Sequence, residues 1–294
     1  MKFIEKVYMY LASRYYFNWL PDKIYIKLCY QCHLGKRLNL KEPKTYNEKL
    51  QWLKLYNRRP EYTDLVDKYR VREYVKEKIG EEYLIPLLGV WDCADAIEFD
   101  LLPEQFVLKC THDSGGVVIC KKKAKLDIQE TKKKLDKFMR RDFYRLHREW
   151  PYKNVPHRII AEKYMVDESG TQLKDYKFFC FDGEPKALFV ATDRNIDTRF
   201  DFYDMDFVHM DVTNGHENAD KEIGKPAGFE EMKSLARILS KGMPHVRVDF
   251  YDIKGKIYFG ELTFFHWSGF VPFVPESYDR MFGDWLHLPE KYES

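Results

Sequence analysis

The sequence predicts an α/β protein of the α+β type, in which helices alternate with antiparallel pairs of strands. Apolar residues recur at the spacing of a helix in four regions, which are residues 1–60, 64–80, 121–148 and 230–242. Three other regions are rich in β-branched and aromatic residues and turn back at a short glycine-containing segment, at residues 106–120, 175–190 and 247–264. At 294 residues, the chain is long enough to build two or three lobes from such elements.

The charge balance excludes one broad class of function. Lys and Arg number 49 against 47 Asp and Glu, so the net charge of +2 does not support a nucleic-acid binder that acts through overall charge. No run approaches the roughly 18 apolar residues of a membrane span, and residues 1–8 lack the apolar core of a secretory signal. We therefore expect a cytoplasmic protein with no membrane span and no nucleic-acid partner.

Residues 1–60 combine helical periodicity with aromatic and basic side chains. Tyr8, Leu11, Tyr15 and Trp19 recur at helical spacing. Two interpretations are open for this region. It docks on the protein's own core, which is the interpretation we favour, or it lies on the anionic inner face of the cell membrane as a peripheral contact.

Lys109 lies near the end of a predicted strand, residues 106–110, and precedes a loop with two consecutive glycines. The loop, residues 111–116, leads into a returning strand at residues 117–120. Such a loop exposes successive backbone N–H groups to a phosphate, and a strand lysine supplies the opposing charge. An ordinary Ser-Gly-Gly turn beside a solvated lysine is the alternative, and the pattern alone does not decide between them.

Two carboxylates lie on facing strands of the predicted hairpin at residues 247–264. We predict a three-residue loop at residues 253–255, because its last residue is a glycine that takes φ > 0 without strain. In that register Asp249 faces Phe259, and Glu261 is its diagonal neighbour on the same face, with Cβ atoms roughly 7 Å apart. Two such carboxylates favour a shared divalent cation such as Mg²⁺. The alternative is an edge hairpin with its polar face in water.

The region between these hairpins offers a competing metal motif. The hairpin at residues 175–190 turns at residues 182–183, and its second strand ends at residues 192–194, where a sheet rim presents functional side chains. We expect residues 195–228 to be irregular. They contain Asp204-Met205-Asp206, and Asp-x-Asp is a motif with which glycosyltransferases hold a divalent metal. A metal-dependent glycosyltransferase is therefore an alternative function.

The order of these features resembles the ATP-grasp fold. A lysine-bearing strand with a Ser-Gly-Gly loop is followed by Glu-Lys-Tyr-Met, by an acidic-basic hairpin, and by Arg-Val-Asp-Phe with Gly-Glu-Leu-Thr beyond it. More narrowly, residues 44–52, 175–183 and 247–264 are similar to the TupA-like ATP-grasp family, which is associated with teichuronopeptide and other bacterial surface-polysaccharide synthesis. The resemblance covers residues 30 to 285, to within a few residues.

The resemblance implies two α/β lobes that grip ATP. It divides the chain into a helical N-terminal extension at residues 1–60, an N-terminal α/β lobe at 61–105, a lid subdomain with the Gly-rich loop at 106–165, and a C-terminal subdomain with the metal site at 166–294.

The resemblance also implies roles for the residues that match the family's motifs. The implied ATP-binding residues are Lys109, Ser114, Gly115 and Gly116 at the phosphates, Glu162, Lys163, Tyr164 and Met165 at the hinge beside adenine, Asp175 at the ribose, and Lys177 near the transferred phosphoryl group. Lys68 matches a second phosphate lysine, with Arg72 as its competitor.

The hairpin residues match the metal and phosphoryl sites of the family. Asp249 and Glu261 match the Mg²⁺ ligands, with Glu261 bridging two ions, and Arg247 matches the basic residue that steadies the transferred phosphoryl group. Arg194 and Lys177 are further candidates for that role, and Lys109 is also expected to take part in catalysis. Many ATP-grasp enzymes have Asn two residues after the bridging Glu, whereas this chain has Thr263. Because threonine offers one shorter oxygen ligand, the number of Mg²⁺ ions stays open.

The activity that the resemblance implies is that of a carboxylate-amine ligase. ATP converts a substrate carboxylate into an acylphosphate, which an amine attacks to give an amide, ADP and phosphate. The expected partners are an amine such as an amino acid and a carboxylate of a surface-glycan precursor such as a uronic acid, while the oligomeric state stays open. Besides the glycosyltransferase, an ATP-binding scaffold without turnover is an alternative.

Overall fold

The computed structural model describes residues 3–167, 173–192 and 197–292. Its α-helices are α1 (Phe3–Ser13), α2 (Asp22–Leu34), α3 (Tyr46–Tyr56), α4 (Tyr62–Val66), α5 (Val71–Lys78), α6 (Ile128–Met139), α7 (Phe143–His147), α8 (Phe229–Ser240) and α9 (Ser277–Trp285). Its strands are β1 (Leu87–Trp91), β2 (Phe106–Cys110), β3 (Val117–Cys120), β4 (Ile159–Lys163), β5 (Asp175–Phe181), β6 (Glu184–Thr192), β7 (Arg199–Tyr203), β8 (His209–Met210), β9 (His245–Ile253) and β10 (Lys256–Thr263). Short 3₁₀ helices are η1 (Glu81–Tyr83), η2 (Ala94–Ala96), η3 (Phe99–Leu101), η4 (Lys123–Lys125), η5 (Trp150–Asn154) and η6 (His266–Gly269).

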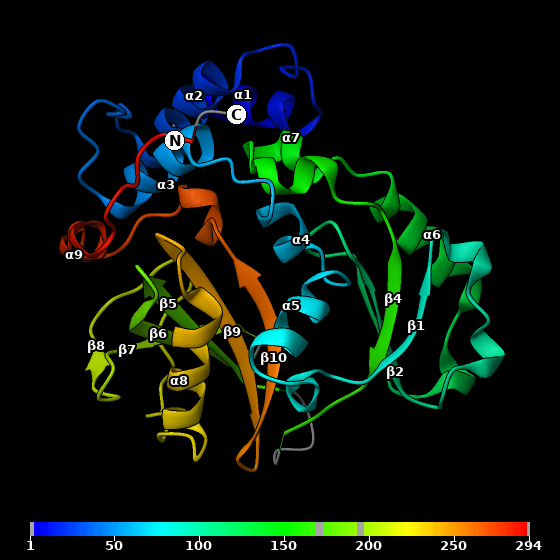
Figure 1. Cartoon of the computed structure of the whole chain (residues 1–294). Coiled ribbons are helices and arrows are strands. Elements are labelled where there is room, and N and C mark those ends of the chain that lie inside the picture. The colour runs from blue at the N-terminus through cyan, green and yellow to red at the C-terminus, as the bar shows by residue number, and fades with distance from the viewer. Residues whose placement is uncertain (1–2, 168–172, 193–196, 293–294) are drawn as a thin grey trace.

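Two antiparallel sheets face each other, with α4 and α5 between them (Figure 1). The smaller sheet has the strand order β1-β4-β2-β3, and α6 covers its outer face. Its core forms where Phe106 and Leu108 of β2 meet Leu135 of α6. The predicted domain boundary at residue 105 falls between β1 and β2, which both belong to this sheet.

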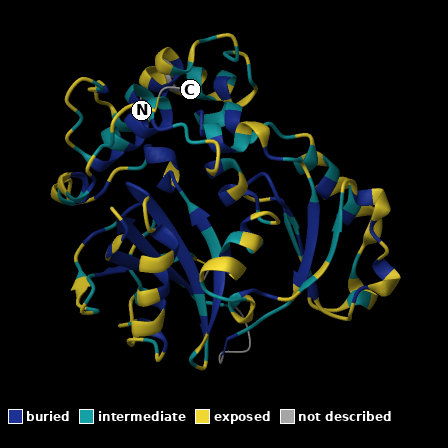
Figure 2. Ribbon diagram, in the orientation of Figure 1, coloured by how far each residue is buried: buried dark blue, intermediate teal, exposed yellow. Residues whose placement is uncertain are grey.

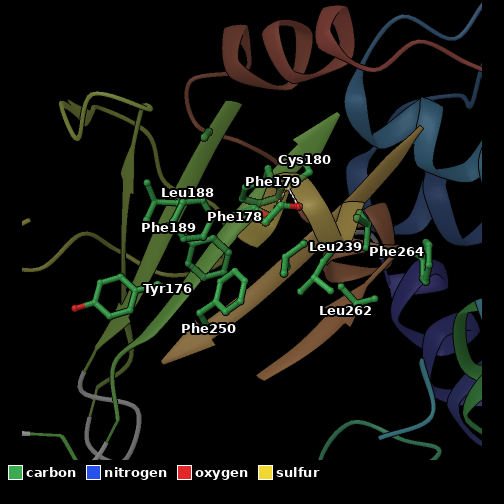
Figure 3. Packing of buried hydrophobic residues seen from close by; sticks show 14 of the residues in the cluster. Tyr176, Phe178, Phe179, Cys180, Leu188, Phe189, Leu239, Phe250, Leu262 and Phe264 are labelled. Atoms are coloured by element: carbon green, nitrogen blue, oxygen red, sulfur yellow. Dashed lines mark hydrogen bonds between the residues drawn. The ribbon is translucent and has the colours of Figure 1, made fainter. Parts of the chain in front are cut away.

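The larger sheet has the strand order β10-β9-β5-β6-β7-β8 and is covered on both faces. Every residue of β5 is buried, although alternate side chains of a strand point to opposite faces. One face packs on α8, and the other packs on η6 and α9, where Phe179 meets His266 and Phe282. Figure 3 shows the large apolar side chains that fill these layers, including Phe178, Phe189 and Phe250. The sheet is therefore a rigid base for side chains at its exposed end.

The N-terminal helices form a separate layer at one end of the molecule (Figure 1). Tyr25, Ile26 and Cys29 of α2 are buried in a cluster with Ala12 and Phe270, so this region docks on the protein's own core, as we expected. The opposite faces of α1 and α2 remain exposed, as the yellow segments in Figure 2 show. Among the helices in the described part of the chain, none combines the length and apolar character that a membrane span requires.

The predicted α/β class and the three hairpins are confirmed. The strand pairs β2–β3, β5–β6 and β9–β10 are antiparallel, and β5 and β6 turn at Asp182-Gly183, where both residues have positive φ. The predicted helix at residues 230–242 is α8. The class prediction succeeded because each hairpin has its own turn chemistry beside alternating apolar residues.

The single helix predicted over residues 64–80 is wrong, because the chain forms α4 and α5 with a turn between them. The Asp67 carboxylate accepts hydrogen bonds from the backbone N–H groups of Tyr69 (2.8 Å) and Arg70 (3.4 Å), which ends one helix and starts the next. The backbone N–H of Lys68 instead donates to Thr111 O at 3.2 Å. This turn places Lys68 beside the loop between β2 and β3.

Further elements were not predicted from the sequence, among them β7, β8 and α9. Residues 199–203 form β7 within the region expected to be irregular, because Phe200 and Phe202 are buried against the sheet. The C-terminal tail contains α9, which packs on α3. The Pro-rich flanks of α9 hide its short helical pattern.

His245, the first residue of β9, predicts a measurable pH dependence of stability. It is buried between Tyr46 OH (2.9 Å from Nε2) and Cys180 O (2.9 Å from Nδ1), and burial lowers its pKa to about 3. Between pH 6.5 and that value the unfolded chain binds a proton that the folded chain does not, so stability falls as pH falls. We expect His245→Gln to reduce that slope by about 1.4 kcal/mol per pH unit, measured by denaturant unfolding at pH 7, 6 and 5. Equal slopes in the two proteins would show that this imidazole binds a proton equally well in the folded and unfolded chains.

Candidate active site

A cavity of about 470 Å³ lies between the two sheets. Apolar side chains form part of its wall, among them Val71, Leu84, Ile85 and Val107. The basic side chains that line it are Lys68, Arg72, Lys109, Lys121, Lys163 and Lys177, and the carboxylates are Glu162, Asp175, Asp249 and Glu261. The cavity is therefore in the size range of small-molecule sites and carries an excess of positive charge, which suits a polyanion.

Most of the residues that the sequence singled out meet at this cavity. Those that line it are Lys68, Lys109, Ser114, Gly115, Glu162, Lys163, Tyr164, Met165, Asp175, Lys177, Asp249 and Glu261. Arg247 and Thr263 lie behind the lining and contact Asp249 and Glu261, respectively. Arg194 lies outside the described residues. Arg72 lines the cavity as well. Lys68 and Arg72, the two candidates for the second phosphate-binding residue, therefore lie in the same site.

Glu162 of β4 organises the basic residues at one side of the cavity. Its carboxylate accepts from Lys109 Nζ at 2.7 Å and lies 3.2 Å from Arg72 Nη1. Arg72 also donates to Ile85 O at 3.0 Å. Lys163, the next residue on β4, uses its backbone N–H to bond Pro86 O at 3.0 Å, which ties the strand to the segment before β1. The strand then leaves the sheet at Tyr164 and Met165, and these two residues line the cavity without ladder partners on β1.

The loop between β2 and β3 closes one end of the cavity. Lys68 Nζ donates to Asp113 O, and Arg141 Nη1 donates to Ser114 O at 3.4 Å. Gly116 donates its N–H to Asp113 Oδ1 at 3.2 Å and has no room for a side chain, because a Cβ there would lie 2.9 Å from Cys110. In this arrangement the N–H of Gly116 is not available to a phosphate, whereas Ser114 and Gly115 line the cavity.

The β9–β10 hairpin brings its two carboxylates together, but not in the predicted register. Its turn has two residues, Lys254 and Gly255, both with positive φ, so Ile253 pairs with Lys256. That turn alone would place Glu261 opposite Val248, on the wrong face. A β-bulge at Gly260 shifts the later pairs by one residue, and Glu261 therefore lies directly opposite Asp249.

Asp249 is buried within a network of cations. Arg247 donates to its two oxygens from Nε (2.7 Å) and Nη2 (2.8 Å), and Lys177 Nζ donates to Oδ2. Burial alone would raise the pKa of Asp249, but Arg247 and Lys177 outweigh it and hold that pKa below its usual value. Burial likewise acts to lower the pKa of Arg247, and the facing Asp249 carboxylate outweighs it. Asp249 and Arg247 are therefore both charged.

Arg247 also has a partner that the sequence did not reveal. Its Nη1 donates to His266 Nδ1 at 2.7 Å, and His266 Nε2 lies 2.8 Å from Asn214 Oδ1. Burial, followed by the charge of Arg247, lowers the pKa of His266 well below its usual value, so the ring is neutral and donates its one N–H to Asn214. The Arg247 guanidinium is therefore held by Asp249 on one side and by His266 on the other.

The segment that carries His266 is fixed by the N-terminal extension. Gln51 Nε2 donates to the carbonyl oxygens of Ser268 and Gly269, each at 2.9 Å, and Lys54 Nζ donates to Ser268 O at 2.7 Å. Burial lowers the pKa of Lys54 to about 8. Gln51 and Lys54 lie three residues apart on α3 and therefore share one helical face. Polar residues on a face that also carries buried apolar residues were the available signal that this helix positions another segment.

The donor set at the end of the hairpin suits a hard cation. Within the described residues, no three Asp, Glu, His or Cys side chains cluster as metal ligands. The site offers instead the carboxylates of Asp249 and Glu261 with the Thr263 hydroxyl, which lies 3.4 Å from Glu261 Oε1. The Glu261 side chain is 44% exposed to the cavity side of the sheet. These oxygens fit Mg²⁺ when phosphate oxygens and water complete the coordination.

The competing Asp-x-Asp motif has a structural role in the β7–β8 turn. Asp204 Oδ1 accepts from the backbone N–H groups of Asp206 (2.9 Å) and Val208 (2.8 Å). Neither aspartate lines the cavity. This arrangement is typical of an Asx turn and gives the glycosyltransferase alternative no support.

The comparisons with known proteins agree with the resemblance read from the sequence. The model of the TupA-like ATPgrasp family matches residues 48–287, which is most of the chain. No curated protein matches this chain.

Several solved structures of other proteins are distantly similar to this chain. D-alanine–D-alanine ligase from Bacillus anthracis, complexed with ATP, is 16% identical with a TM-score of 0.40, over 68% of this chain and 53% of that one. The D-alanine–D-alanine ligase from Helicobacter pylori is 14% identical with a TM-score of 0.43, over 84% and 70%. N5-carboxyaminoimidazole synthase from Aspergillus clavatus is 14% identical with a TM-score of 0.41, over 78% and 53%. This chain thus spans little more than half the length of the Bacillus anthracis ligase and of the Aspergillus clavatus synthase. These similarities are too distant to assign a function.

Proposed function

Because the chain belongs to the TupA-like ATPgrasp family, we propose that it is an ATP-dependent ligase that joins a carboxylate to an amine through an acylphosphate. The observation that carries the proposal is that four features line one cavity. They are the end of β4, the glycine loop between β2 and β3, several lysines, and the facing carboxylates of Asp249 and Glu261. Each of these features has a counterpart in the chemistry of a bound nucleoside triphosphate.

We propose that the nucleotide runs from the end of β4 to the end of the β9–β10 hairpin. Backbone groups of Tyr164 and Met165 would hold the edge of adenine between apolar walls, and Asp175 would accept from the ribose hydroxyls. Lys109 and Lys68 would contact the phosphates beneath Ser114 and Gly115. The cavity is lined by both the apolar side chains and the lysines that this arrangement requires.

Mg²⁺ is the proposed metal, and Asp249, Glu261 and Thr263 are its proposed ligands. Bound there, the ion would neutralise charge on the phosphate oxygens. Arg247 and Lys177 compensate the Asp249 carboxylate within the protein itself. Lys177 lines the cavity and would also donate to a phosphate oxygen, whereas Arg247 lies behind Asp249 and would act through its charge. Whether one or two ions bind depends on the single hydroxyl of Thr263.

The proposed reaction has two steps. A carboxylate oxygen of the first substrate attacks the γ-phosphorus and the bond to ADP breaks. The amine of the second substrate then attacks the acyl carbon, phosphate leaves, and the amine loses a proton. Arg247 and Lys109 lower the repulsion between the two anions of the first step, an effect that contributes several kcal/mol in such sites. The loop at Ser114 and Gly115 would exclude water from the acylphosphate.

We propose a uronic acid or similar glycan carboxylate and an amino acid as the substrate classes, within bacterial surface-polysaccharide synthesis. Support comes from the family resemblance alone, so the test must search both classes. We expect ATP with a uronate and hydroxylamine to give a hydroxamate and stoichiometric ADP, because hydroxylamine traps an acylphosphate.

The assay distinguishes the ligase from a scaffold without turnover. Release of ADP that depends on both a carboxylate and an amine supports the ligase. Tight Mg-ADP binding without ADP release for any carboxylate and amine pair would favour the scaffold. If a carboxylate of another class gave the hydroxamate, the proposed type of reaction would stand, but the proposed uronate substrate would be wrong.

A further inference from the structure

The exposed side of α1, the following turn and α2 carries an unusual concentration of large apolar side chains. Many of the exposed large apolar residues in the described part of the chain lie on this side, including the most exposed aromatic residue among them, Trp19, which is 76% exposed. The apolar and aromatic members are Val7, Tyr10, Tyr16, Trp19, Ile24 and Leu28. Isolated exposed apolar residues need no explanation, but a contiguous group on one short segment marks an interaction surface.

Helical geometry places these side chains on faces that point away from the core. On α2, Ile24 and Leu28 are four residues apart and exposed, whereas Tyr25 and Cys29 beside them are buried. On α1, Val7 is exposed, whereas Ala12 is buried in the same cluster as Tyr25. The inner faces are therefore satisfied by the protein, and the outer faces are not.

Basic side chains are interleaved with the apolar ones. Lys6, Arg14, Lys23 and Lys27 are all exposed, and none of them forms an ion pair with a carboxylate of the described residues. We call these four together with the six apolar residues the N-terminal surface. The sequence spacing puts Lys23 and Lys27 beside Ile24 and Leu28 on the exposed face of α2.

The N-terminal surface contains almost no opposing negative charge. Asp22 is the one carboxylate in residues 6–37. Its charge is compensated by side chains from other parts of the protein. Arg58 Nη2 lies 2.6 Å from it, Arg148 Nε lies 3.3 Å from it, and Tyr144 OH donates to both of its oxygens at 2.8 Å. The outward charge is therefore positive, although the whole chain is nearly neutral.

We propose that the N-terminal surface binds the surface of a lipid bilayer that contains anionic headgroups. Trp and Tyr favour the level of the headgroups, aliphatic side chains enter the acyl boundary, and lysines reach back to the anionic groups. A nucleic acid would use the cations but not Ile24 or Leu28. Helices of 11 and 13 residues lie on such a surface and are too short to cross it.

The test is co-sedimentation of the full chain with vesicles of zwitterionic phosphatidylcholine, alone or mixed with phosphatidylglycerol. We expect binding to the mixed vesicles at low salt and weaker binding as salt is raised. Lys23→Gln combined with Lys27→Gln should weaken binding about thirtyfold, since each basic residue near an anionic membrane contributes about 1 kcal/mol, or about fivefold. Trp19→Ala combined with Leu28→Ala should weaken binding to the mixed vesicles as well.

The matched control is Leu101→Ala combined with Lys186→Gln, which removes an exposed leucine and an exposed lysine from outside the N-terminal surface. It should bind like the wild type. All substituted side chains are exposed, and thermal unfolding checks that each variant keeps its fold. The emission of Trp19, obtained as the difference between wild type and Trp19→Phe, should shift to shorter wavelength on vesicles.

Three results would overturn the proposal. The folded wild type fails to bind mixed vesicles at low salt, or the N-terminal variants bind them as well as the wild type. The third is concentration-dependent dimerisation that Trp19→Ala abolishes, without vesicle binding, which would assign the surface to a second copy of the chain. Because catalysis is not measured, these outcomes are independent of whether the proposed ligase reaction is correct.

Discussion

Replacing Glu261 with Gln is expected to lower ADP release by about 10²–10³-fold while leaving the fold intact. The side chain lies opposite Asp249 on β10 and is the more exposed of the two carboxylates. Gln keeps the shape but removes the charge that would hold Mg²⁺ at the phosphates, and losses of this kind cost about 3–4 kcal/mol of transition-state stabilisation. The measurement is the rate of ADP release with saturating ATP and the best carboxylate and amine found.

The matched control for this variant is Asp206→Asn. It removes an exposed carboxylate of the competing Asp-x-Asp motif, and we expect no change in rate. A normal rate in Glu261→Gln together with a large loss in Asp206→Asn would move the metal site to the β7–β8 turn and contradict its assignment to the β9–β10 hairpin.

Asp249→Asn is expected to destabilise the fold by about 3–5 kcal/mol, in addition to abolishing activity. Asp249 is 1% exposed, and its carboxylate is shared by Arg247 and Lys177. Removing one partner of a buried ionic group leaves the others buried without compensation. Denaturant unfolding at pH 7 gives the free energy of unfolding of both proteins.

Glu261→Gln serves as the comparison for stability. Glu261 is 44% exposed and lies 3.3 Å from Arg247 Nη2, so solvent screens the pair and its loss should cost less than about 1 kcal/mol. If Asp249→Asn were no less stable than Glu261→Gln, the buried cation network around Asp249 would not be a source of stability.

The parts of the fold that the sequence predicts are those with local signals. The β5–β6 hairpin was predicted because Asp182-Gly183 is a strong turn between two apolar runs, and α8 was predicted because its apolar face repeats at helical spacing. The break between α4 and α5 was missed because one carboxylate, Asp67, stabilises a turn inside a continuous amphipathic pattern. β7 was missed because its two phenylalanines gain their partners only from the finished sheet.

The sequence predicted which residues form the site better than it predicted how they are arranged. Asp249 and Glu261 were expected on one face as diagonal neighbours, but the expected register was wrong, since the turn has two residues and a bulge at Gly260 places the two carboxylates directly opposite each other. A glycine inside a strand was the available signal. His266 and Asn214 could not be linked to Arg247 from the sequence, because the three residues meet only through tertiary structure.

The most direct test of ATP binding in the cavity is the nucleotide dependence of thermal stability in the wild type and in Lys109→Met. We expect Mg-ADP to stabilise the wild type, by about 2.7 kcal/mol at one hundred times its dissociation constant, and Mn-UDP and Mn-GDP to have no such effect. Lys109→Met should need about 10–100 times more Mg-ADP for the same protection, because it loses one charged phosphate contact. Protection by Mn-UDP in place of Mg-ADP, or an unchanged response in Lys109→Met, would contradict the assignment of the cavity to ATP.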